Sequence, residues 1–311
     1  MKTLVLAHYY TIPEVQQMAD FVGDSLELSL RARESNAERI VFAGVKFMAE
    51  TAKIINPNAE VIIPDIDATC SLVTMAEEGY PNLQTILSEF IHHIDPTIVT
   101  YINSDFRVKA VSDIIVTSAN VENIVSDLIN QGRDVFFTPD RNMGAYLQSQ
   151  HPEWGDKFMY YTKAVCEVHD KFKAEEIDKI LSKKWKDYPD VLIAHPESPL
   201  PVLERAYLVG STSKMLNWIK EYKGKSTIYV ATEEGLLYNM REARPDLDIR
   251  LAPMYTGCQC NACPYMKKNT KEAVIAAIEG KSGSVIDYIP ETLRKRAKIP
   301  IDAMLNWRSS K

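Results

Sequence analysis

The sequence predicts an α/β fold of three similar domains, each a four-stranded parallel sheet flanked by helices. Short apolar runs alternate with helical patterns along the chain, which is typical of parallel strands joined by helices. The same order of runs occurs three times, and Ser25, Ser118 and Ser211 recur at intervals of 93 residues. A period of this length indicates three domains rather than a solenoid of small repeats.

Each predicted domain contains four strands and supplies a cysteine. The first, residues 1–95, has strands at 4–8, 20–23, 39–43 and 60–64, helices near 13–14, from Ser25 and at 45–55, and Cys70. The second, residues 96–188, has strands at 97–101, 113–116, 134–138 and 157–161, helices at 107–111, from Ser118 and near 142–149, and Cys166. The third, residues 189–269, has strands at 191–195, 206–209, 227–231 and 248–252, helices at 201–205, from Ser211 and at 234–243, and the segment 257–269.

The remaining segments are expected to be helical. Amphipathic helices at 71–91 and 174–184 are predicted to connect the domains. Residues 270–311 are predicted to form a helical tail that packs on the body. Its first helix, 270–279, has Asn269 as its expected N-cap, and its second spans 289–307.

Composition and charge exclude several classes of function. The chain has 311 residues, 46% hydrophobic and 25% charged, which is ordinary for a globular protein. A net charge of −6 provides no basic surface for nucleic acid. The apolar run at the start is too short for a signal peptide, and no segment reaches transmembrane length. An odd number of unevenly spaced cysteines favours metal or catalytic roles in a reduced cytoplasm over a disulfide framework.

Polar side chains follow corresponding strands of the three domains. His8, Tyr101 and His195 follow the first strands, and a serine follows each second strand. Because ligands bind at the carboxyl ends of parallel strands, these side chains converge on one cavity if the three sheets face one another. Serines at helix starts would then offer anion sites for a ligand with several phosphate or carboxylate groups. Each serine alone is explained as well by helix capping.

The cysteines favour a shared metal centre. Cys70 and Cys166 stand alone, whereas Cys258, Cys260 and Cys263 lie within six positions. One thiolate from each region would hold a [4Fe–4S] cluster and leave one iron open as a Lewis acid. A zinc site completed by His169, or buried thiols without a metal, are the alternatives that spacing alone leaves open.

Short motifs along essentially the whole chain resemble the quinolinate synthase family. They are L-A-H-Y-Y (6–10), P-E-V-Q (13–16), A-D-F-V-G-D-S-L (19–26), G-V-K-F-M-A-E-T-A-K (44–53), P-D-x-x-A-T-C-S-L (64–72), T-Y-I-N-S (100–104), V-K-A-x-S-D (108–113), T-S-A-N (117–120), P-D-R-N-M-G (139–144), C-E-V-H (166–169), A-H-P-E (194–197), V-G-S-T (209–212), T-E-E-G (232–235) and C-N-A-C-P-Y-M-K-K-N-T (260–270). Each is weak alone, but the ordered set is specific.

The resemblance implies pseudo-threefold symmetry around a central [4Fe–4S] cluster with three cysteine ligands, Cys70, Cys166 and Cys263. It implies condensation of iminoaspartate with dihydroxyacetone phosphate to quinolinate, phosphate and water, in NAD biosynthesis. The iron that has no cysteine ligand would act as a Lewis acid and assist the loss of a hydroxyl group as water. A functional contact with the enzyme that supplies iminoaspartate is a further expectation, and nucleic acid and membrane partners are not expected. Cys263 is selected by its motif, because the repeat period does not favour it over Cys258 or Cys260.

The resemblance also implies roles for individual residues. The expected catalytic residues are Glu197, Tyr10 and Tyr101. The expected substrate-binding residues are His8, Ser25, Tyr101, Asn103, Ser118, His195, Glu197, Ser211 and Thr212. A histidine at a strand end is alternatively structural, and a carboxylate at a helix start is alternatively stabilised by the helix dipole. Lys53 and Lys109 are assigned no role, because lysines on helices are usually solvated.

Departures from the family pattern narrow the choice of cysteine ligands. Ala43, Val116 and Ser198 stand where many relatives have further cysteines, which leaves Cys70 and Cys166 without nearby rivals. Lys46 replaces a common histidine, and the extra N-terminal helix of many relatives is not seen before the first strand. Two other classes of protein fit the sequence less well. A radical enzyme of the diphthamide-synthesis type conflicts with the Ser/His/Tyr-rich cavity, and a metal-dependent sensor would need an output surface that the sequence does not show.

Overall fold

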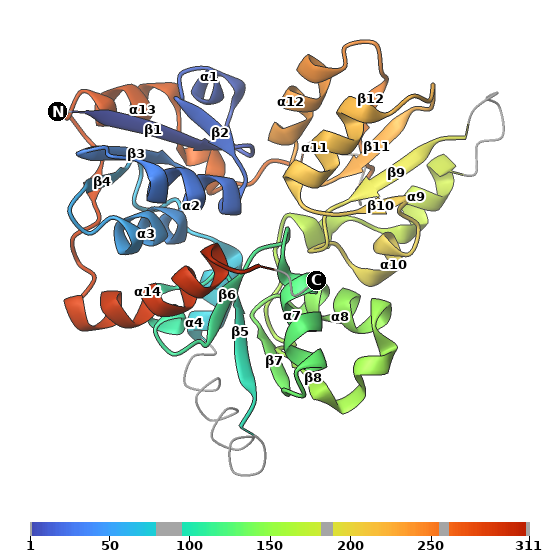
Figure 1. Ribbon diagram of the computed structural model, residues 1–311. Coiled ribbons are helices and arrows are strands. Elements are labelled where there is room, and N and C mark those ends of the chain that lie inside the picture. The colour runs from blue at the N-terminus through green and yellow to red at the C-terminus, as the bar shows by residue number, and fades with distance from the viewer. Residues whose placement is uncertain (1, 79–94, 182–188, 255–260, 309–311) are drawn as a thin grey trace.

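The computed structural model describes residues 2–78, 95–181, 189–254 and 261–308. Strands and helices alternate through these residues, and helices flank each of three sheets (Figure 1). The α/β class with parallel sheets is therefore confirmed. The domain boundaries and the pseudo-threefold arrangement stay predictions.

The first sheet has one strand more than predicted. Its order is β13-β4-β3-β1-β2. The strands are β1 (Thr3–His8), β2 (Phe21–Gly23), β3 (Arg39–Ala43), β4 (Glu60–Ile63) and β13 (Ser284–Val285). The first four are parallel, whereas β13 pairs antiparallel with β4. The prediction that residues 270–311 are wholly helical is thus wrong at β13, which covers backbone groups that an edge strand would expose.

The other two sheets have four parallel strands each, as predicted. Their orders are β6-β5-β7-β8 and β10-β9-β11-β12. In all three sheets the second parallel strand of the set lies at an edge, next to the first strand. The strands are β5 (Thr97–Tyr101), β6 (Ile114–Val116), β7 (Val135–Thr138), β8 (Phe158–Tyr160), β9 (Val191–Ala194), β10 (Leu208–Val209), β11 (Ile228–Ala231) and β12 (Ile249–Leu251). Their continuous apolar runs suit sheets that helices cover on both faces.

The helices largely follow the predicted positions. They are α1 (Pro13–Gln16), α2 (Ser25–Glu34), α3 (Lys46–Ile55), α4 (Ser71–Glu78), α6 (Phe106–Lys109), α7 (Val121–Asn130), α8 (Arg141–Gln150), α9 (Ala174–Leu181), α10 (Leu200–Leu203), α11 (Thr212–Glu221), α12 (Gly235–Ala243), α13 (Lys271–Ile278) and α14 (Glu291–Leu305). Short 3-10 turns are η1 (Pro152–Lys157), η2 (His169–Lys171) and η3 (Met266–Lys268). The predicted ends of the two connecting helices, beyond 78 and 181, lie outside the described residues. Among the described residues, no helix combines the length and apolarity that a bilayer crossing requires.

Two helix starts differ from the prediction. Helix α7 begins at Val121, not at Ser118, because Asn120 Oδ1 accepts the Thr117 N–H at 2.7 Å and closes a turn before the helix. Helix α13 is capped by Thr270, whose hydroxyl accepts the N–H of Ala273. The expected cap Asn269 is instead buried, and its amide donates to the carbonyls of Gly44 and Met266.

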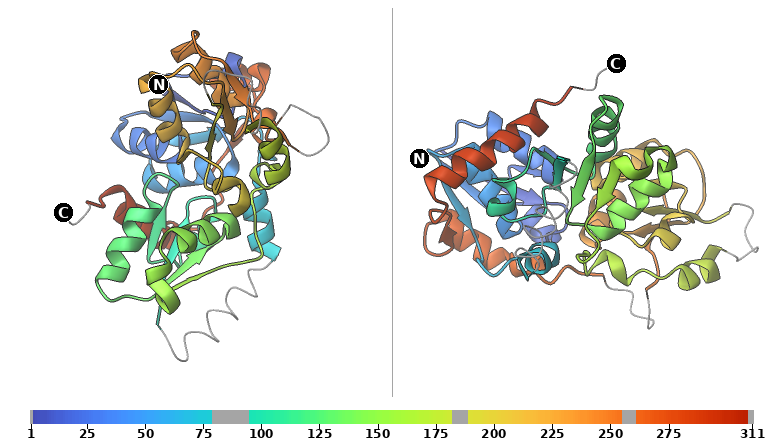
Figure 2. Two further views of the ribbon diagram at one scale, coloured as in Figure 1. Left: turned by 90° about the vertical axis from the view of Figure 1, so that its right-hand side faces the viewer. Right: turned by 90° about the horizontal axis from the view of Figure 1, so that it is seen from below.

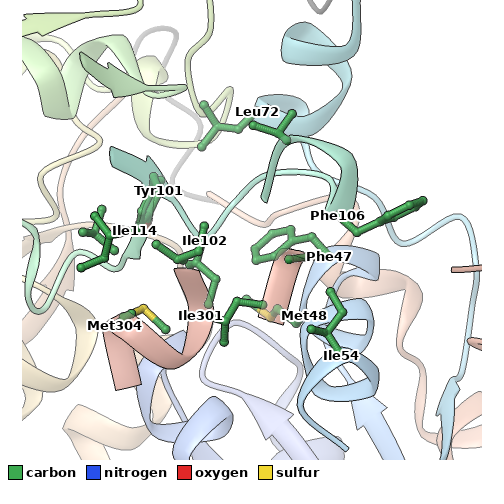
Figure 3. Packing of buried hydrophobic residues seen from close by; sticks show 14 of the residues in the cluster. Phe47, Met48, Ile54, Leu72, Tyr101, Ile102, Phe106, Ile114, Ile301 and Met304 are labelled. Carbon is green, nitrogen blue, oxygen red and sulfur yellow. The ribbon is translucent and has the colours of Figure 1, made fainter. Parts of the chain in front are cut away.

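The C-terminal helix α14 joins the first and second sheets. Figures 1 and 2 show it along the outside of the molecule, beside α3 and β6. Its buried Ile301 and Met304 belong to one cluster with Met48 of α3 and Ile102 after β5 (Figure 3). Because full burial of such a side chain stabilises the fold by about 1.5–3 kcal/mol, α14 holds the two sheets together.

Candidate active site

One cavity lies where strand ends of the three sheets meet. It encloses about 620 Å³ of space, including solvent at its mouth. The predicted residues in its wall are His8, Tyr10, Ser25, Cys70, Tyr101, Asn103, Ser118, Cys166, His195, Glu197, Thr212 and Cys263. The carboxyl ends of parallel strands bring these side chains together. Ser211 is the exception among the predicted residues: it is buried as the N-cap of α11, and its hydroxyl accepts the N–H of Lys214.

The three serines do not occupy equivalent helix positions. Asp24, not Ser25, caps α2, because its carboxylate accepts the N–H groups of Leu26 and Glu27. Ser118 precedes the turn before α7, and its hydroxyl lies 3.2 Å from His195 Nε2. The alternative that each serine is a helix cap therefore holds only for Ser211, since Asp24 caps α2 and Ser118 lies before the start of α7.

Three cysteine-bearing loops meet in the cavity wall. Burial raises the pKa of the Cys70, Cys166 and Cys263 thiols, that of Cys263 to about 11. Nearby Cys263 also raises the pKa of Cys70, so the thiols lie within electrostatic range of one another. Thiols in such a wall become thiolates only where a cation compensates, and the donor set therefore fits a thiophilic metal centre. Cys258 and Cys260 lie outside the described residues.

Hydrogen bonds hold each of these loops. Ser71, next to Cys70, donates its hydroxyl to the Val165 carbonyl and accepts the Glu167 N–H, so it contacts both neighbours of Cys166. A different residue holds the third loop: Glu233 Oε1 accepts the N–H of Cys263 at 2.9 Å.

Glu233 also connects the third loop to the first sheet. Its carboxylate pairs with Lys267 at 2.8 Å, and Lys267 donates to the Tyr10 carbonyl. Burial raises the pKa of Glu233 to about 7, against the opposing charge of Lys267. The T-E-E-G and cysteine motifs contained both residues, but only the folded chain shows that they meet.

A second donor group lies beside the cysteines. Ligand atoms of Cys166, His169 and Glu197 lie within 4.8 Å of one another. His169 Nδ1 is 2.8 Å from Glu197 Oε2 and 3.2 Å from Cys166 Sγ. His169 Nε2 is 2.9 Å from Thr232 Oγ1. This group could bind a metal, and His169 and Thr232 were not among the predicted site residues.

Glu197 is an ionised carboxylate in a buried position. Its side chain is 3% exposed, and the His195 imidazole lies 3.3 Å from its Oε2. Burial opposes its ionisation, but the imidazoles of His195 and His169 outweigh burial and hold the pKa of this carboxyl well below its usual range. Asn103 Nδ2 donates to its other oxygen at 3.4 Å. Glu197 is therefore ready to accept a proton.

The phenols beside Glu197 keep their protons. Burial, with the negative charge of Glu197, raises the pKa of Tyr10 and of Tyr101 well above the usual range. His8 is a neutral donor, because burial lowers its pKa to about 3 and its Nδ1 accepts the N–H of Tyr10. The proton of His8 is therefore on Nε2.

The prediction that Lys109 is solvated is wrong. Its side chain is fully buried, and its Nζ donates to the Ser104 carbonyl. Burial lowers the pKa of Lys109 to about 8, while the carboxylates of Glu50 and Asp105 oppose that shift. A helical lysine is buried here because α6 packs against α3, where the Lys109 Nζ lies 5.3 Å from the centre of the Phe47 ring, and the sequence of α6 alone does not indicate this contact.

The chain is similar to known proteins over almost its full length. A family profile described as Quinolinate synthetase A protein matches residues 1–306. A quinolinate synthase from Cyanothece sp. is 40% identical over 306 residues, which is 98% of this chain and 90% of that protein. Quinolinate synthases from Cyanophora paradoxa and Prochlorococcus marinus are also 40% identical, over 98% and 99% of this chain and 88% of each relative. The chain therefore belongs to the quinolinate synthase family of enzymes.

Proposed function

We propose that the protein condenses iminoaspartate with dihydroxyacetone phosphate to quinolinate, phosphate and water, as a step of NAD biosynthesis. The observation that carries this proposal is the meeting of three cysteine-bearing loops with an acid/base set in one cavity. Membership of the quinolinate synthase family supports the product.

Donors around the cavity suit two carboxylates and a phosphate. His8 Nε2–H is a neutral donor, as its tautomer requires. Thr212 is the first residue of α11, where free N–H groups and the helix dipole favour anions. Ser25 is the first residue of α2, whose next two N–H groups are held by Asp24, so Ser25 offers its hydroxyl to the cavity. Ser118 and His195 lie together on another part of the wall. These groups are proposed to bind and orient the two substrates.

The acid/base roles follow from opposite pKa shifts. Glu197, ionised, is proposed to accept protons from the bound intermediates. Tyr10 and Tyr101, both protonated, are proposed to donate. Groups whose environments move their pKa values apart commonly divide the roles of base and acid in this way.

Cys70, Cys166 and Cys263 are proposed to hold a [4Fe–4S] cluster. When bound, such a cluster with three protein thiolates supplies an iron that acts as a Lewis acid for the loss of a hydroxyl group as water. The zinc alternative required His169 as the fourth ligand. Membership of the quinolinate synthase family favours the cluster over zinc.

The proposed location is the cytoplasm, where the cluster and the thiols would stay reduced. A functional contact with the enzyme that supplies iminoaspartate is part of the proposal. A net charge of −6 argues against nucleic acid as a partner.

An anaerobic assay tests the function. Protein reconstituted with iron and sulfide is mixed with dihydroxyacetone phosphate and iminoaspartate formed in place from aspartate, and quinolinate is measured. We expect quinolinate and phosphate in equal amounts from brown protein, and neither from the metal-free chain. Colourless protein after reconstitution, or no quinolinate from brown protein, would contradict the proposal.

A further inference from the structure

Four side chains, three of them buried, form a continuous row at the cavity. Tyr10 OH lies 2.8 Å from Thr232 Oγ1, which lies 2.9 Å from His169 Nε2. His169 Nδ1 lies 2.8 Å from Glu197 Oε2. Thr232, His169 and Glu197 are buried. The two ends of the row, Tyr10 and Glu197, are the proposed acid and base.

Thr232 is the middle link of the row. A hydroxyl can donate and accept at once, so that of Thr232 can bond the Tyr10 phenol and His169 Nε2 together. The other ring nitrogen of His169 lies against Glu197. Loss of the hydroxyl would therefore break the only link in the row between the phenol and the ring.

The row crosses all three sheets. Tyr10 follows β1 and His169 follows β8, whereas Thr232 directly follows β11. Glu197 follows β9, which pairs with β11 in the same sheet. A single hydroxyl from the third sheet therefore links side chains that the first and second sheets supply.

We propose that Thr232 is a positioning residue for the reaction. Its hydroxyl ties the phenol of Tyr10 to the imidazole of His169, and through that ring it sets the orientation of Glu197. The acid and the base are thereby held in fixed relation although different sheets supply them. This inference rests on the proposed function for its kinetic readout, but not for its structural one.

Thr232→Val tests the proposal because valine keeps the shape and removes the hydroxyl. We expect the kcat for quinolinate to fall about tenfold or more, since a buried donor and a buried acceptor lose their partner. KM should change by less than about threefold, since Thr232 is not part of the cavity wall. Thr232→Ser restores the hydroxyl and should recover most of kcat. Iron content should equal that of the wild type in both variants.

Thr51→Val is the matched control. Thr51 is equally buried, but its hydroxyl donates only to the Phe47 carbonyl within α3. Its kcat should stay at the wild-type value. Three results would overturn the positioning role. They are a wild-type kcat in Thr232→Val, an equal loss of kcat in Thr232→Val and Thr51→Val, and a kcat that Thr232→Ser does not recover.

Crystal structures separate this inference from the proposed function. In Thr232→Val we expect the Tyr10 phenol and the His169 ring to leave their wild-type positions. If the wild type forms no quinolinate, the proposed function fails, and these structures still decide the inference. Unmoved Tyr10 and His169 rings in the variant would overturn it.

Discussion

At the scale of single residues, Glu197 gives the sharpest test of the site. Glu197→Gln keeps the size of the side chain but removes the base. We expect the iron content to be unchanged and kcat to fall by about a hundredfold or more, as loss of a general base commonly does. Quinolinate formation and iron per chain measure the two effects. Near-normal turnover would show that Glu197 only stabilises the cavity wall.

The amino acids of the cavity were largely predictable, but their contacts were not. Glu197, Tyr10 and His8 belong to short motifs whose position after a strand fixes where they point. Thr232 and Glu233 lie in an equally visible motif, yet their partners come from distant parts of the chain. Lys109 was assigned to solvent because its burial depends on packing against other elements. Such contacts need tertiary structure.

At the scale of elements, buried ionisable groups join α3, α6 and the tail. Tyr288 donates its hydroxyl to Glu50 at 2.6 Å, and Lys109 lies in the same network. Burial raises the pKa of Glu50 to about 7, above its usual 4.5. The folded chain therefore holds a proton on Glu50 that the unfolded chain releases as pH rises from 4.5 toward 7. Stability from this group is fully present below pH 4.5 and is lost as pH rises through about 7.

Glu50→Gln should remove this dependence. Relative to the variant, the wild type should lose about 2 kcal/mol of unfolding free energy between pH ~5.5 and pH ~7. Urea unfolding of metal-free protein at both pH values measures the difference. Glu14→Gln, at an exposed position in the first turn of α1, is the control and should show no such change. If the difference in unfolding free energy between wild type and Glu50→Gln is the same at both pH values, Glu50 does not have a raised pKa in the folded chain.

The loops that carry cysteines give another element-scale prediction. Ser71 bridges the backbone on both sides of Cys166 from its place beside Cys70. Ser71→Ala removes both bonds, so we expect less iron per chain after reconstitution and faster loss of the metal in air. Ser149→Ala, in which the lost hydroxyl bond is an exposed one to Tyr146 within α8, is the control. Equal iron retention in the two variants would argue against a role for Ser71.

At the scale of the whole molecule, the sequence predicted the strands better than the connections. Apolar runs mark every parallel strand, so their positions agree within one or two residues. Strand β13 has two residues and no apolar run, so it is recognisable only by its pairing with β4. The start of α7 was misplaced because the Asn120 side chain accepts the Thr117 N–H and closes a turn before the helix. Local hydrogen bonds decided these details, whereas hydrophobic periodicity decided the architecture.

Which of Cys258, Cys260 and Cys263 is the third ligand also depends on contacts across the whole molecule. Cys263 lines the cavity, and Glu233 from the third sheet holds its N–H while Lys267 reaches Tyr10 of the first. A ligand must be held where the other two loops meet, and these bonds hold Cys263 there. We expect Cys263→Ala to lose the cluster, as Cys70→Ala and Cys166→Ala should.

Cys258→Ala and Cys260→Ala serve as matched controls for that choice. Both should keep wild-type iron and visible absorbance, because the three proposed ligands from separate loops are intact. Iron analysis and absorbance of all five anaerobically purified variants give the answer. If Cys258→Ala or Cys260→Ala loses the cluster and Cys263→Ala keeps it, the third ligand is not Cys263. The role of Glu233 would then be to fix Lys267 beside Tyr10, since that contact does not depend on which thiol binds iron.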